Sequence, residues 1–139
     1  MMTGLFHAHS HWRYIVIVTI LITLIRLLMS TVKRINSNEN LWTKSHKTLC
    51  LLSIIAVDIQ LLTGVILWLL RVANGGIASL GRRLWEHPFI MILGVVFLHI
   101  AFKQAKKAPE DKKLTLVTIW YASGAFLLFA GILHILRMS

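Results

Sequence analysis

Seven histidines, in a chain with only five acidic residues, are the side chains best suited to chemistry in this sequence. Neutral imidazole binds haem iron, copper and zinc through a ring nitrogen. Five of the histidines lie beside the ends of apolar runs: His7, His9, His11, His87 and His134. The pattern predicts a group of metal or haem ligands at one end of the fold. It leaves open whether the three N-terminal histidines are ligands or an ordinary polar segment at a membrane surface.

A second group of polar residues interrupts the apolar runs themselves. Asp58 is the most anomalous of them, because a lone carboxylate near the middle of a bilayer costs at least about 2.5–3.5 kcal/mol. Counted from the outer helix ends at the rise of an α-helix, Arg26, Asp58 and His99 all fall roughly 18–21 Å deep. The count predicts an inner polar layer of these three residues. The layer is either a structural ion pair with His99 bonded to it, or a proton relay or cofactor anchor.

Four apolar runs must position these side chains. The chain has 139 residues, 57% of them hydrophobic, and a mean hydropathy of +0.74, which is too apolar for a soluble domain. Each run has roughly the twenty residues that cross the hydrocarbon of a bilayer as a helix. The sequence therefore predicts an all-α membrane protein with one domain over residues 1–139. It is an antiparallel four-transmembrane-helix bundle with helices at about 12–34, 47–71, 85–105 and 112–136.

The basic residues indicate the orientation of this bundle. Nine lysines and arginines fall in the connections after the first and third runs, against five on the opposite side. The positive-inside rule then places both termini outside, which in a bacterial inner (cytoplasmic) membrane is the periplasm. We expect Trp12, Trp68 and Trp85 at the outer interface, and His46 in the solvated inner one. The net charge of +10 reflects topology and attraction to anionic lipid, so no nucleic-acid partner is expected.

The start of the third run combines a carboxylate, an imidazole and a proline. Pro88 suits the first position of a helix, which makes His87 the cap residue with its ring free to turn over the bundle mouth. Glu86 can pair with Arg13 or orient a neighbouring histidine. In the last run, two glycines share one face, where a helix or a flat cofactor could approach closely: Gly124 and Gly131.

Four segments of the chain carry a resemblance to a known family: GLFHAHS at 4–10, IQLLTGVIL at 59–67, EHPFIM at 86–91 and KQAKK at 103–107. Together they resemble a family of small bacterial four-helix integral membrane proteins that are often labelled as cytochrome b-like. The resemblance covers nearly the whole chain and implies the same fold, with a haem b cofactor. This chain departs from the family pattern at Asp58, where histidine is frequent, and near His134.

The function we expect is that of a membrane b-type cytochrome-like protein with one haem at the outer end. Its axial ligands would be His87 or His134 with one of the three N-terminal histidines. Cations near the haem propionates would come from Arg13, Arg71, Arg82 and Arg83. Such a protein would pass single electrons between quinol and a periplasmic or membrane partner, without itself making or breaking substrate bonds.

Three other functions remain open on the sequence alone. The first is a copper or zinc site without porphyrin, with Glu86 supporting ligands from His87, His9, His11 and His134. The second is a non-catalytic membrane subunit or adaptor without a cofactor, either as a homo-oligomer or in a larger complex. The third is a proton or ion path that uses Asp58 and His99.

Overall fold

The computed structural model describes residues 2–37, 39–75 and 83–137. These residues form four helices: α1 (Met2–Ser37), α2 (Lys44–Gly75), α3 (Arg83–Lys107) and α4 (Glu110–Leu136). Each of the four is long and apolar enough to cross a membrane. The structure therefore confirms an all-helical chain with four candidate spans.

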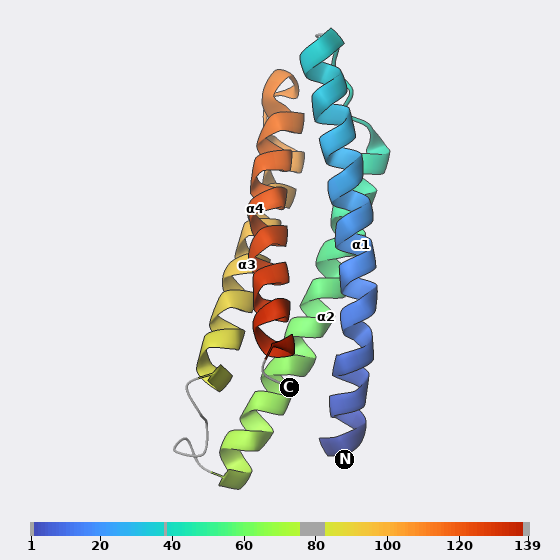
Figure 1. The fold of residues 1–139 in the computed structure, drawn as a ribbon. Helices are drawn as coiled ribbons and strands as arrows, with labels where there is room; N and C mark the ends of the chain where they lie inside the picture. Colours follow the sequence, from blue (N-terminus) through green and yellow to red (C-terminus); the bar gives the residue numbers. More distant parts are fainter. Residues whose placement is uncertain (1, 38, 76–82, 138–139) are drawn as a thin grey trace.

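The helices pack as two pairs, α1 with α2 and α3 with α4, and the pairs meet through α2–α3 and α1–α4 contacts. Within the described residues α1 does not contact α3, so these two helices lie diagonally across the bundle. Figure 1 shows that α1 begins, and α4 ends, toward one end, here named the N-terminal end. The core between the helices is filled by branched aliphatic side chains and one tyrosine, among them Ile20, Val57, Leu98, Tyr121 and Leu128.

Two helix starts differ from the prediction. Helix α1 begins at Met2 instead of near Trp12, because residues 2–11 contain no proline and continue the helical pattern into a polar stretch. At about 1.5 Å per residue it is roughly 54 Å long, so it exceeds the ~30 Å of a hydrocarbon core. Helix α3 begins at Arg83, so Pro88 lies inside it and His87 is not a cap. The helix tolerates this proline near its start at the loss of one backbone hydrogen bond.

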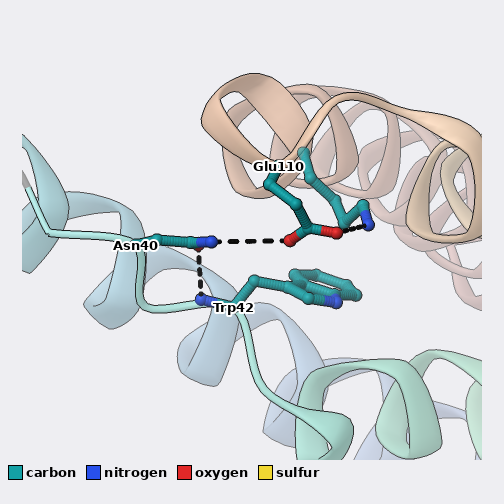
Figure 2. A network of polar contacts seen from close by, with 4 residues as sticks. Asn40, Trp42 and Glu110 are labelled. Atoms are coloured by element: carbon teal, nitrogen blue, oxygen red, sulfur yellow. Dashed lines mark hydrogen bonds and ion pairs between the residues drawn. The ribbon is translucent and has the colours of Figure 1, made fainter.

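The opposite end of the bundle is closed by the connection between α1 and α2. Asn40 accepts a hydrogen bond from the Trp42 backbone N–H at 3.2 Å and donates to Glu110 at 3.4 Å. Glu110, the first residue of α4, also pairs with Lys113 (Figure 2). Two polar side chains thus tie this connection to the start of the last helix.

His46 is buried, with 2% of its surface exposed, so the expectation of a solvated side chain is wrong. Its Nδ1 accepts a hydrogen bond from the Thr43 backbone N–H at 3.1 Å, in the manner of a capping box. The ring proton must then be on Nε2, which lies 2.8 Å from Ser30 Oγ on α1. Trp42 stacks on the ring with centroids 5.3 Å apart. Both ring nitrogens are therefore used to hold the start of α2 against α1.

We expect His46→Ala to lower the free energy of unfolding by about 2 kcal/mol, because the Thr43 and Ser30 polar groups lose a buried partner. Thermal unfolding in detergent, followed by circular dichroism, measures the change. The matched control is His11→Ala, since His11 is exposed and its ring bonds only within α1. Equal stability of the two variants would contradict this role.

Candidate functional site

Three of the predicted ligands come together at the N-terminal end of the bundle: His9 of α1, His87 of α3 and His134 of α4. His87 lies close enough to both His9 and His134 to interact with them electrostatically. The three histidines lie 78 residues (87 minus 9) and 47 residues (134 minus 87) apart in the sequence, and their helices place them at the same end of the bundle. They are the centre of the candidate site.

His9 is fixed against α2. Its Nδ1 lies 3.0 Å from Thr63 Oγ1, and that hydroxyl donates its own proton to backbone carbonyls of α2 at 3.0 Å. Thr63 therefore accepts the Nδ1 proton, which leaves the lone pair of the ring on Nε2. The Gln60 amide nitrogen donates to this Nε2 at 3.2 Å and to the His9 carbonyl at 3.1 Å. Gly64 makes room for the ring, because a Cβ there would lie 2.9 Å from Cε1.

We expect Thr63→Val to lower the free energy of unfolding by about 1 kcal/mol, since the isosteric side chain removes the acceptor of the His9 Nδ1 proton. A double-mutant cycle with His9→Ala should show coupling of about 0.5–1.5 kcal/mol. Thr48→Val is the control, because the Thr48 hydroxyl is exposed and bonds only to Lys44 in its own helix. Additive effects of Thr63→Val and His9→Ala would refute the bond.

His87 is held in the same manner by α4. Its Nδ1 donates a hydrogen bond to the Gly131 carbonyl at 3.1 Å, so the lone pair of this ring is also on Nε2. Among the contacts of the described residues, none engages that nitrogen. A histidine whose Nδ1 proton is bound by a carbonyl or hydroxyl is oriented for ligation through Nε2. His46 differs from His87 in this respect, since both nitrogens of His46 are hydrogen-bonded, as are those of His9.

The carboxylate near the site is on α3. Glu86 Oε2 lies 3.3 Å from His134 Nε2, within ion-pair distance but without hydrogen-bond geometry. Glu86 thus lies beside a histidine, which is one of the two partners predicted for it. Arg13, the other alternative, lies one turn from His9 on α1, with its guanidinium over the Tyr14 ring at 5.2 Å.

The remaining predicted ligands do not join this group. His7 and His11 are exposed and share another face of α1, with rings 6.4 Å apart, because helical spacing separates them from His9. His11 Nδ1 bonds to the His7 carbonyl at 2.8 Å. Arg82 lies outside the described residues, and Arg83 is described only as the first residue of α3.

Buried polar atoms without a hydrogen-bond partner gather at this end. The described chain has four of them, and three belong here: Gln60 Oε1, Trp68 Nε1 and His134 Nε2, the last of which still has Glu86 within ion-pair distance. Trp68 packs edge-on against Trp85 of α3, with ring centroids 5.0 Å apart. Such atoms are rare in native proteins, because leaving them unpaired costs desolvation energy, so each calls for a partner. The site therefore offers both a donor and an acceptor to a bound group.

The donor set distinguishes between metal sites. Within the described residues, no three side chains of histidine, cysteine, aspartate or glutamate are close enough to hold one metal ion. A zinc or copper ion bound by the protein alone needs three or four such ligands. Haem iron needs only two, because the porphyrin supplies the other four. A pair of anchored imidazoles, such as His9 and His87, meets that smaller number of ligands.

The predicted inner layer is only partly formed. Asp58 Oδ1 and His99 Nε2 lie 3.0 Å apart, but no ion pair joins Asp58 to Arg26 among the described residues. Thr23 contacts Ser53, and Ser30 contacts His46, so Arg26 lies between these two levels of α2.

The depth count failed because it took Trp12 as the outer end of the first helix. The Trp12 indole donates to the Ala56 carbonyl at 2.8 Å, so Trp12 lies level with the turn of α2 that carries Asp58. Arg26 is nearly four turns beyond Trp12 along α1, so it lies far from the level of Asp58. Trp12 also does not belong to an outer aromatic belt.

The buried polar layer is instead made of small hydroxyl groups that the sequence reasoning did not select. Thr23 and Ser53, on α1 and α2, lie 2.8 Å apart and also bond to backbone carbonyls of their own helices. The fully buried Tyr121 of α4 lies beside both. The available signal was weak, since hydroxyl residues at helical spacing are common in apolar helices.

Comparison of the chain with protein-family models, with curated proteins and with solved structures finds no match.

Proposed function

We propose that this chain is an integral membrane haem protein that holds one haem b through His9 and His87 and transfers single electrons. The observation that carries the proposal is the matched anchoring of the two rings. Thr63 holds Nδ1 of His9, and the Gly131 carbonyl holds Nδ1 of His87, so both have their lone pair on Nε2. The two residues stand on α1 and α3, which lie diagonally across the bundle.

The residues around the two imidazoles support this assignment. A hydrogen bond at Nδ1 fixes the ring tautomer and raises the basicity of the ligating nitrogen. The Gln60 amide donates to His9 Nε2, which places the lone pair on that nitrogen, and a bound iron would have to displace this hydrogen bond. The Trp68 indole N–H has no partner within the described chain and could donate to a carboxylate. Arg13 is the nearby cation for a propionate, and Arg82 and Arg83 are further candidates from the sequence.

Bound at this site, haem would supply a one-electron iron couple, with quinol and a periplasmic or membrane protein as the proposed redox partners. The chain's own contribution is to orient the two ligands and to exclude water with apolar helices. The proposal includes an antiparallel bundle in a bacterial inner membrane with periplasmic termini. Two observations support it: the α1–α2 contacts run in opposite directions (9 with 63, 30 with 46), and the lysines gather at the opposite end.

The test is the absorption spectrum of the full chain, purified in mild detergent from cells supplied with a haem precursor. We expect a Soret band, and after reduction the narrow α band of a haem with two nitrogen ligands, at one haem per chain. Protein that is colourless on purification, and that binds no haem on titration, would reject the proposal. Copper or zinc in such a colourless preparation would favour the site without porphyrin.

A further inference from the structure

The Asp58–His99 pair lies on the outer surface of the bundle, where α2 and α3 meet. The two side chains are 46% and 52% exposed, although both stand well inside their candidate membrane spans. Their neighbours one turn away on the same faces are exposed apolar residues: Ile55 and Leu62 on α2, and Val96 on α3. We name this surface the α2–α3 face. It is apolar except for one acid and one imidazole near the middle of the membrane.

This arrangement is unfavourable for a chain that stands alone in lipid. Hydrocarbon offers no hydrogen bond, so a half-exposed carboxylate and imidazole there need a polar partner. Only one atom of each is engaged, Oδ1 of Asp58 and Nε2 of His99. Within the contacts of the described residues, Oδ2 and Nδ1 have no partner. With Asp58 ionised and His99 protonated, the two side chains would present one free acceptor, Oδ2, and one free N–H donor, Nδ1.

We propose that a second copy of this chain covers the α2–α3 face, with its two-fold axis along the membrane normal. Rotation about that axis keeps every residue at its own depth, so the pair of one copy meets the same pair of the other. His99 of each copy then donates through Nδ1 to Asp58 of the partner subunit. The face is self-complementary because it carries one donor beside one acceptor. In that protonation state the two pairs carry no net charge within the interface.

Arg26, a further charged residue inside a candidate membrane span, does not offer this complement. Arg26 is exposed on α1, but it lies between the levels of Ser53 and His46 and not at that of Asp58. Because the axis preserves depth, the arginine of a second copy would also miss Asp58. A lipid headgroup cannot reach the pair, since it stays at the interface.

Disulfide cross-linking in native membranes tests the interface. The background is Cys50→Ala, which removes the single, buried cysteine. Leu62→Cys and Val96→Cys place a thiol on the α2–α3 face, while Ile22→Cys and Phe126→Cys place one on exposed positions of α1 and α4. We expect mild oxidation to link at least ten times more chain into dimers for the first two variants than for the other two. Equal cross-linking from all faces, or none from the α2–α3 face, would overturn the proposal.

Substitution of the polar pair tests what holds the copies together. In the Leu62→Cys background, Asp58→Leu with His99→Leu should reduce the cross-linked dimer about tenfold, with unchanged helical content by circular dichroism. The exchange Asp58→His with His99→Asp keeps a donor and an acceptor at the same depth and should restore the dimer, whereas either single change should not. Undiminished cross-linking in the double leucine variant would overturn the role of the pair. A purified complex with one copy of this chain and another polypeptide across the face would overturn the choice of occupant.

Discussion

His87→Ala should remove at least nine-tenths of the haem absorbance of the purified chain, the largest effect we expect from any single substitution. No contact of the described residues engages His87 Nε2, while Nδ1 is bound to the Gly131 carbonyl. Alanine removes the ligand, and the Gly131 carbonyl is then left with its own helix for hydrogen bonding. The measurement is the Soret absorbance per chain, with bound haem quantified as its pyridine complex.

Two controls separate loss of the ligand from loss of the fold. His11→Ala changes a histidine on the same helix as His9, but its ring is exposed and bonds only within α1, so the haem content should be unchanged. His87→Ala should keep the unfolding temperature within a few degrees, because the substitution breaks only one hydrogen bond between helices. Wild-type absorbance in folded His87→Ala would exclude His87 as a ligand. Equal loss in His11→Ala would place the site elsewhere.

The sequence was sufficient for the elements that hydropathy controls. Four apolar runs of membrane-spanning length predicted the four helices, because a bilayer leaves the backbone little alternative. The placement of the three N-terminal histidines could not be predicted in the same way. Helical periodicity puts His9 on a different face from His7 and His11, but an alternating His-x-His-x-His pattern fits an extended chain equally well.

The failures have one physical origin, which is that depth along a helix cannot be counted without knowing where the helix begins. Trp12 was taken for an interfacial residue, yet its indole bonds to the Ala56 carbonyl well inside the bundle. The resulting error moved Arg26 to the level of Asp58. The burial of His46 was missed for a related reason, because its partners Thr43 and Ser30 are identified only by the packing of α1 on α2. Register between helices depends on side-chain fit, which single-sequence patterns do not report.

A close approach between α3 and α4 involves a glycine that the sequence reasoning did not select. Gly94 of α3 faces Gly124 of α4, and these two helices form the most extensive contact in the fold. A Cβ on Gly124 would lie 2.9 Å from the Gly94 carbonyl oxygen and 3.0 Å from Leu98. Backbone cannot move away without separating the helices. Of the two predicted uses of Gly124, a closely packed helix is the one found here.

Gly124→Ala should therefore destabilise the fold by about 1–3 kcal/mol, the range for overpacking a close contact. In an unconstrained helix the same change would stabilise by up to ~1 kcal/mol, so the sign alone is diagnostic. Gly131→Ala is the matched control on the same helix, because its Cβ would meet side chains alone, the flexible Met91 thioether at 3.0 Å and Ile90 Cγ2 at 3.3 Å, and not backbone. Unfolding in mixed detergent micelles of increasing SDS content measures both.

The same crossing sets the position of the proposed ligand. His87 and Gly131 stand seven residues from Gly94 and Gly124 in the two helices, which is two turns, or about 10 Å, toward the N-terminal end. Forcing α3 and α4 apart at the glycines should lengthen the His87–Gly131 hydrogen bond that orients the ring. We therefore expect Gly124→Ala to weaken haem binding as well, by the 10–100-fold typical of losing a partner behind a ligand. Stability lost without any change in haem affinity would show that the crossing and the site are independent.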